Sequence, residues 1–245
     1  MSLPMDAASN TAASIIELTF FRMRNTQDSM VQRTNDFLSK SYIPALQRAG
    51  AKHIGAFTNV IGEGNPRTLL VAEYADVTTW GDSGRKVSTD KDLQKEGDAF
   101  YAGPLQYVRK DVVVLRGFSS IPSVVIPKPR SEKNTHIFEL RTYESNHQRS
   151  LARKIRMFDE GEIAIFRKVG MIPVFFGEAL AGANLPQLTY MLAYDDLAAR
   201  EKAWSAFQAH PEWNKMKNEP GASDGEIVSN ISNAILRPLP FSSIR

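Results

Sequence analysis

The sequence has 245 residues, 42% of them hydrophobic and 23% charged, as in globular proteins of one large or two small domains. Its 30 basic and 27 acidic side chains give a net charge of +3, which is too small and too evenly spread to indicate nucleic-acid binding. Cysteine is absent, which excludes disulfides, thiolate catalysis and zinc–thiolate sites. No apolar run reaches the length of about 18 residues that predicts a membrane span, so we expect a cytoplasmic protein.

In chain order, residues 1–14 lack the charged and apolar regions of a signal peptide, and we expect a disordered leader there. Alternating apolar residues then start a first unit at "IIELTFF", and this unit extends over 15–116 to the strand "DVVVLR". The stretch 117–135 contains three prolines and is expected to be an extended linker. A second unit covers 136–245.

The second unit has the clearer pattern. "HIFELRTY" alternates as a strand, and a helical pattern follows that ends at Gly170, a residue that terminates helices at little cost. "PVFFGEAL" and "QLTYMLAY" form a hairpin, Asp195 or Asp196 caps the next helix, and "SNISNAILR" is the last strand. The order β-α-β-β-α-β predicts a four-stranded antiparallel sheet with both helices on one face, a ferredoxin-like arrangement.

The two units are similar to each other. "NPRTLLVAEYADVTTW" aligns with "LPQLTYMLAYDDLAAR", and Pro66 then lies 120 residues (186 − 66) before Pro186. Three further blocks align in the same order at offsets of 120 to 122 residues, and one of them places Glu17 on Glu139. We therefore predict two copies, the first ending before the linker and the second at 137–237.

A single copy would leave one face of its sheet uncovered and expose a large apolar patch. Two copies packed sheet to sheet bury that patch within one chain. The predicted fold is therefore α+β, with two tandem ferredoxin-like (βαββαβ) repeats packed sheet to sheet as an α+β barrel.

Three motifs of the second copy carry a resemblance to a known family. "FELRTYE" (138–144), "YDDLAAREKAW" (194–204) and "HPEW" (210–213), followed by a strand near "ILRPLP", resemble the NIPSNAP family, which is similar to the dimeric α+β barrel group. The first copy keeps the layout but not these motifs. The resemblance supports the barrel fold, and it implies no particular reaction because the family has no common one.

The first strand of the second copy supplies the main candidate site. Glu139, Arg141 and Tyr143 share one face of the strand, and the apolar alternate set is expected to face the helices. The three polar residues should then line the barrel interior, with Arg141 binding an acidic or carbonyl ligand and Tyr143 donating a hydrogen bond. The alternative, which we favour, is an ion pair or a network between the sheets that fixes how the two halves dock.

Secondary candidates are Glu17, His210 and Trp213. Glu17 is retained in the first copy without its arginine and tyrosine neighbours, so any such site is asymmetric. His210 precedes Pro211, and is either a general base or single metal ligand, or a helix-end residue before a break. We favour the second interpretation, in which Trp213 is a buried packing anchor and Trp204 is also largely buried. The other histidines have no ligand spacing, so no metal site is predicted.

We therefore expect a NIPSNAP-like barrel that binds a small organic ligand in its interior or interacts with a protein, and that forms no complex with nucleic acid. The alternative is a small-molecule enzyme of the barrel group, such as a cofactor-independent or haem-linked monooxygenase. No cofactor is expected, although haem held by a single histidine stays open, as does a homo-oligomer. Glycine-containing turns such as "AGANLP" do not open a helix, which argues against nucleotide binding.

Overall fold

The computed structural model describes residues 12–128 and 135–245, so most of the expected leader and part of the expected linker lie outside the described residues. The elements in chain order are β1 (Ile15–Arg22), α1 (Met30–Phe37), a π-helical turn (Leu38–Tyr42), α2 (Ile43–Arg48), β2 (Ile54–Ile61), β3 (Arg67–Tyr74), α3 (Val77–Ser88), α4 (Lys91–Ala102), β4 (Arg109–Gly117), β5 (Ile137–Glu144), α5 (Gln148–Met157), a second π-helical turn (Phe158–Glu162), α6 (Ile163–Lys168), β6 (Ile172–Ala181), β7 (Gln187–Tyr194), α7 (Leu197–Ala209), α8 (Pro211–Lys217), α9 (Asp224–Ile227) and β8 (Asn230–Pro238).

The strands join into one closed antiparallel barrel in the order β1-β3-β2-β8-β5-β7-β6-β4. Hydrogen bonds between β2 and β8 and between β4 and β6 connect the N-terminal half to the C-terminal half. The predicted α+β barrel is therefore present. Its closure depends on hydrogen bonds across two junctions as well as on the packing of two sheet faces, and it leaves no unpaired edge among the described strands.

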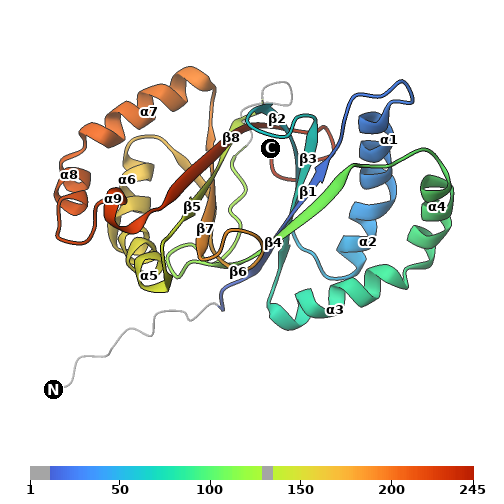
Figure 1. Cartoon of the computed structure of the whole chain (residues 1–245), viewed down its shortest axis with the longest axis horizontal. Helices are drawn as coiled ribbons and strands as arrows, with labels where there is room; N and C mark the ends of the chain where they lie inside the picture. The colour runs from blue at the N-terminus through green and yellow to red at the C-terminus, as the bar shows by residue number, and fades with distance from the viewer. Residues whose placement is uncertain (1–11, 129–134) are drawn as a thin grey trace.

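Each half carries its helices on the outside of the barrel, and Figure 1 shows the two helical layers on opposite sides of the molecule. The strand order β4-β1-β3-β2 of the N-terminal half recurs as β8-β5-β7-β6 in the C-terminal half. A π-helical turn interrupts the first long helix of both halves, at Leu38–Tyr42 and at Phe158–Glu162. Such turns are rare and often occur at functional sites.

Side chains form three apolar clusters. One cluster fills the barrel and includes Phe57, Phe138, Leu140 and Phe175. The other two lie between the sheet and the helices of the N-terminal half and of the C-terminal half. Over most of their length the strands therefore pack against protein on both faces, which favours apolar residues there.

The predicted orientation of β5 is wrong. Phe138 and Leu140 belong to the barrel cluster, whereas Tyr143 belongs to the cluster under the helices of the C-terminal half. Glu139 and Arg141 lie on the same side as Tyr143. Side chains from eight strands fill the barrel with apolar groups, which offer a carboxylate no partners, whereas the helix side supplies donors for it.

Several local structures are formed as the sequence predicts. Asp196 caps α7, because its carboxylate accepts a hydrogen bond from the Ala199 backbone N–H at 2.8 Å. Gly170 ends the first helix of the C-terminal half in a left-handed conformation with φ of +88°. His210 lies at the break between α7 and α8. Across the described ranges, every helix falls short of the length and apolarity that a membrane crossing requires.

Candidate functional site

Glu139 on β5 is fully buried, and its carboxylate is surrounded by donors. On Oε1 the donors are Arg141 Nη1 (3.0 Å), Arg200 Nη2 (2.6 Å) and Asn233 Nδ2 (3.0 Å), and on Oε2 they are Tyr194 OH (3.2 Å), Arg200 Nε (3.0 Å) and Trp204 Nε1 (2.9 Å). Burial alone would raise the pKa of Glu139, but the hydrogen bonds from Arg200 and the charge of Arg141 hold it below its usual value. With about four lone-pair positions to offer, this carboxylate has none left for a ligand.

Arg141 and Tyr143 complete this polar cluster. Arg141 Nη2 donates to the Tyr143 hydroxyl at 3.2 Å, and the guanidinium lies over the ring of Trp204 at 4.6 Å from its centroid. The Tyr143 hydroxyl also accepts a hydrogen bond from Tyr190 at 3.0 Å. The structure thus brings the three predicted residues together, but in a packed cluster under α7 and not around an open cavity of the barrel interior.

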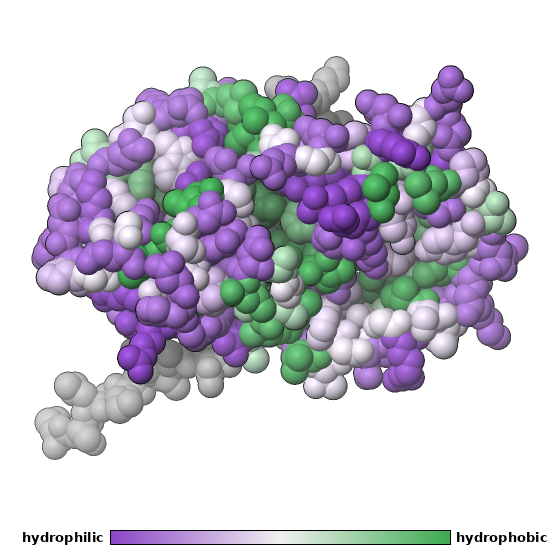
Figure 2. Space-filling view, in the orientation of Figure 1, coloured by the Kyte–Doolittle hydropathy of each residue, from purple (hydrophilic) through white to green (hydrophobic). Residues whose placement is uncertain are grey.

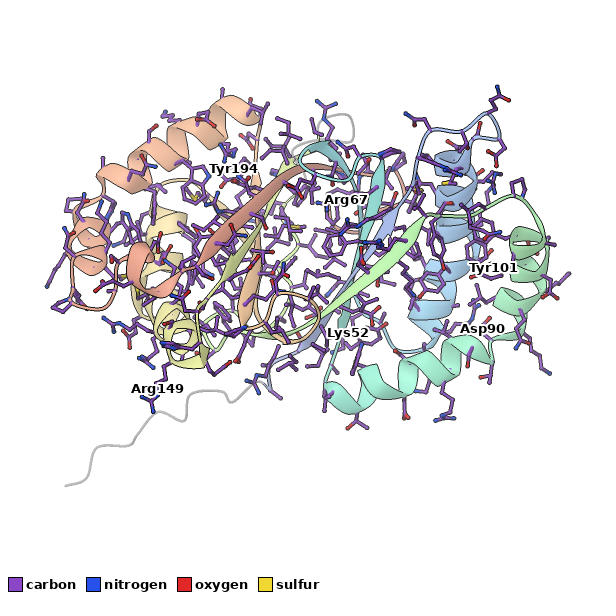
Figure 3. The ribbon with its side chains drawn as sticks, viewed as in Figure 1. Lys52, Arg67, Asp90, Tyr101, Arg149 and Tyr194 are labelled. Atoms are coloured by element: carbon purple, nitrogen blue, oxygen red, sulfur yellow. The ribbon has the colours of Figure 1, made fainter. Side chains whose placement is uncertain are left out.

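The equivalent position in the N-terminal half has a different environment. Glu17 on β1 lines a cavity of about 510 Å³ between the sheet and the helices α2, α3 and α4. The lining residues are Glu17, Tyr42, Leu46, Tyr74, Ser83, Gly84, Val87, Ser88, Leu93, Gln94, Gly97, Asp98, Tyr101, Lys110 and Val112. Tyr101 projects from α4 (Figure 3), and Tyr42 comes from the π-helical turn. This volume falls within the usual range for small-molecule sites.

The carboxylate of Glu17 is only partly engaged. Its Oε2 accepts from Trp80 Nε1 at 2.7 Å, and its Oε1 accepts from Thr19 Oγ1 at 2.9 Å. Two donors leave about half of the acceptor capacity of a carboxylate for a ligand. In the described residues Glu17 has no arginine partner, unlike Glu139.

Two tyrosine hydroxyls of the cavity are held in the protonated form. Burial, together with the negative charge of Glu17, raises the pKa of Tyr42 to about 12 and that of Tyr74 to about 12. The Tyr74 hydroxyl is buried and has no hydrogen-bond partner among the described residues. Ser83 also lines the cavity, and its hydroxyl donates to the Trp80 carbonyl at 2.6 Å. Both tyrosines can therefore donate to a ligand at neutral pH.

Lys110 brings a positive charge to the same cavity. Its ammonium lies 3.4 Å from the Tyr42 hydroxyl and 5.8 Å from the ring centroid of Phe21. No carboxylate within the described ranges forms an ion pair with it. The cavity thus combines an acceptor, two neutral donors and a cation with apolar walls, which is the composition of a small-molecule site.

The cavity exists because bulky side chains of the C-terminal half have small counterparts in the N-terminal half. Aligned at offsets of 120 to 122 residues, the pairs are Gly84 with Trp204, Val87 with Phe207, Leu93 with Trp213, and Thr19 with Arg141. In the C-terminal half Phe207 packs on Trp213 with ring centroids 4.7 Å apart. In the N-terminal half, a Cβ added to Gly84 would meet no atom within 4 Å.

The other predicted candidates lie outside this cavity. Trp213 is buried, as predicted, and packs on Phe207, whereas Trp204 is only half-buried. His210 has a buried Nδ1 without a hydrogen-bond partner in the described part of the chain, and it lines neither this cavity nor the barrel mouth described below. The described residues also contain no group of three or more histidine, aspartate or glutamate side chains that could hold a metal ion.

Sequence reasoning identified Glu17 but missed the other functional residues of the cavity, chiefly Tyr42, Tyr74, Gly84 and Lys110. Their signal was present in the internal alignment, which pairs Gly84 with Trp204. A small residue in the first copy, at a position where the second copy has a large buried one, indicates an empty space. This inference requires that the large residue is packed in the second copy, and only the structure shows that it is.

Comparisons with known proteins agree with the fold. A family model described as NIPSNAP matches residues 138–243. A candidate monooxygenase from Lactobacillus acidophilus is 10% identical with a TM-score of 0.59, covering 92% of this chain and 94% of its own. Another from Fusobacterium nucleatum is 10% identical with a TM-score of 0.58, covering 93% of both chains. An uncharacterized NIPSNAP-like domain protein from Burkholderia xenovorans is 25% identical with a TM-score of 0.40, covering 44% of this chain and 90% of its own. At 10% identity the first two show a shared fold alone. No curated protein matches the sequence significantly.

Proposed function

Because the NIPSNAP family model matches only the C-terminal half of the chain, and that half is filled with side chains, we propose that ligand binding takes place in the N-terminal half. The ligand is a small aromatic hydroxy compound that occupies the cavity beside Glu17. The contrast between Glu139, which has six donors, and Glu17, which has two, is the observation that carries this proposal.

The chemistry of the cavity selects this ligand class. Glu17 accepts a hydrogen bond from the ligand hydroxyl, and Tyr74 or Tyr42 donates to a second oxygen. The apolar walls, among them Leu46 and Val87, take the ring. A hydrogen bond to a charged group contributes about 1.5–3 kcal/mol, so Glu17 provides orientation as well as affinity.

We also infer that the two halves are tandem ferredoxin-like repeats, at 15–116 and 136–245, joined by the segment 117–135. The shared strand order, and the π-helical turns that lie 120 residues apart, support this inference. After duplication, one copy kept a packed interior that stabilises the chain, and the other became the binding half.

A filled cavity should abolish binding. We expect wild-type protein to quench 1-naphthol fluorescence saturably, and Gly84→Trp to remove the quenching, because the introduced indole takes the place that Trp204 occupies in the other half. Gly81→Trp is the matched control, since Gly81 lies on the same helix, does not line the cavity and also has open space around its Cα. Equal binding by both variants, or no saturable quenching by wild type, would refute the proposed site.

A second candidate function is a cofactor-independent monooxygenase acting on the same ligand class. The position of Glu17 favours it, because a carboxylate facing the cavity can accept the phenolic proton. The electron-rich anion then reduces molecular oxygen, and one oxygen atom enters the ring as a quinone carbonyl while the other leaves with two protons as water. Oxygen uptake with 1-naphthol that is lost in Glu17→Gln supports the enzyme. Tight binding without uptake supports a binding protein.

The haem-linked version of this enzyme does not fit the cavity. Neither this cavity nor the barrel mouth contains a histidine among its lining residues, so an imidazole-ligated haem has no axial ligand there. We expect haem titration to produce no shifted Soret band. A shifted band that persists in His210→Ala would show that another residue ligates the iron and would contradict this conclusion.

A further inference from the structure

Three arginines lie side by side at one end of the barrel. Arg22, at the end of β1, is the direct partner of Arg67 on β3 and of Arg109 on β4. Like charges directly opposite each other on neighbouring strands repel and destabilise a sheet. The corresponding row of the C-terminal half is different, because there Glu144 is the partner of Gln187 and of Asn230. The C-terminal half therefore forms its part of the barrel without a row of cations, so barrel closure does not explain the three arginines of the N-terminal half.

Few negative charges balance this row. Arg22 Nε pairs with Asp111 at 2.6 Å, and Arg67 Nε donates to the neutral Asn59 side chain at 2.8 Å. Across residues 12–128 and 135–245, no carboxylate forms an ion pair with Arg67 or Arg109. Burial lowers the pKa of Arg67, the adjacent charge of Arg22 lowers it further, and the negative charge of Glu63 offsets part of this lowering. Arg67 is thus a partly desolvated guanidinium that forms no ion pair within the described part of the chain.

Arg67 and Arg22 line an open cavity of about 770 Å³ at this barrel mouth. Thr142, Gln187 and Thr189 of the C-terminal half and the apolar Leu18 and Leu140 also line it, and so do four charged residues, Glu63, Lys110, Asp111 and Glu144. Arg67 lies near the middle of the molecule, between the two helical layers (Figure 3). In the same view, apolar side chains lie beside a strongly hydrophilic patch near the middle of the face (Figure 2). The surroundings can take a ligand with a charged group and an apolar body.

We propose that the barrel mouth is a second binding site, for a small molecule whose oxyanion is held by Arg67 and Arg22. The planar guanidinium of Arg67 offers two parallel N–H donors to the oxygens of a carboxylate or a phosphate. Its stacking on Phe20, at 5.1 Å from the ring centroid, holds the guanidinium in place. Glu17 does not line this site, which shares only Lys110 and Val112 with the cavity under the helices α2–α4.

Calorimetric titration at constant ionic strength tests the site with two probes, inorganic phosphate and benzoate. We expect saturable binding of at least one probe, weakened about tenfold or more in Arg67→Gln, since losing a charge-assisted bidentate contact removes more than about 1.4 kcal/mol. Arg67→Lys keeps the positive charge but cannot donate two parallel hydrogen bonds. Its affinity for the probe should lie between those of wild type and Arg67→Gln. The probe that binds identifies the oxyanion as phosphate or carboxylate.

Two controls make the result specific. Arg85→Gln removes an equal charge from the exposed face of α3 and should leave binding unchanged. Gly84→Trp fills the other cavity and should also bind the probe normally, which separates this site from the proposed one. If Arg67→Gln does not fold, Arg22→Gln takes its place. Failure of both probes to bind wild type, or unchanged binding after loss of Arg67 or Arg22, overturns the proposal.

Discussion

Glu139→Gln is expected to destabilise the protein by about 3–5 kcal/mol, the cost of leaving buried charges without their partner. The carboxylate accepts hydrogen bonds from Arg141 and from two nitrogens of Arg200, and both guanidiniums are largely removed from solvent. A neutral amide cannot balance them, and its N–H₂ group would face other donors. Urea denaturation monitored by tryptophan fluorescence measures the change.

Glu17→Gln is the matched control for this result. Its carboxylate has two donors and no arginine, so the expected loss of stability is below about 1.5 kcal/mol, the usual net value of a hydrogen bond.

The difference in stability between wild type and Glu139→Gln should also depend on pH. Because the folded-state pKa of Glu139 lies below its usual value of 4.5, the stability it contributes is complete above that value. It is lost as the pH falls through the folded pKa, where wild type and Glu139→Gln should converge. Equal losses for both substitutions at neutral pH would contradict the assigned roles.

Trp213→Ala is expected to cost about 3–5 kcal/mol, the usual range for deletion of a large buried aromatic side chain. Trp213 is 7% exposed, packs on Phe207, and offers its ring face to the ammonium of Lys154 at 5.2 Å. Lys154 is itself 1% exposed and pairs with Glu162 at 3.1 Å, so the loss of Trp213 also opens this ion pair to water. The midpoint of thermal unfolding should fall accordingly.

Leu93→Ala provides the control in the N-terminal half. Leu93 occupies the position equivalent to Trp213 but borders the cavity, so its removal should cost no more than about 2 kcal/mol, the low end for Leu→Ala. Trp213→Phe should keep most of the stability of wild type. A near-unchanged melting temperature for Trp213→Ala would show that α8 does not hold the C-terminal half together.

Features that are decided by residues close together in the sequence could be predicted from the sequence alone. Asp196 caps α7 and Gly170 ends the preceding helix, since capping and left-handed turns are decided by the residue itself and its nearest backbone. The barrel also followed, because the regular alternation of apolar residues and the recurrence near an offset of 120 residues leave few ways to cover all strand faces. The burial of Trp213 was also predicted, because the second helix of the repeat must cover its sheet.

The sequence alone did not show which face of β5 points into the barrel. Alternation divides Glu139 from Phe138, but it does not say which face is inner when both faces pack against protein. Arg200 and Trp204 lie about sixty residues away on α7 and supply hydrogen-bond donors to Glu139 on the helix side of the sheet. Only the tertiary structure brings them there.

The cavity beside Glu17 likewise depends on the absence of a side chain at Gly84. An absent side chain becomes a binding site only when surrounding helices enclose the space, and their packing is a property of the whole fold.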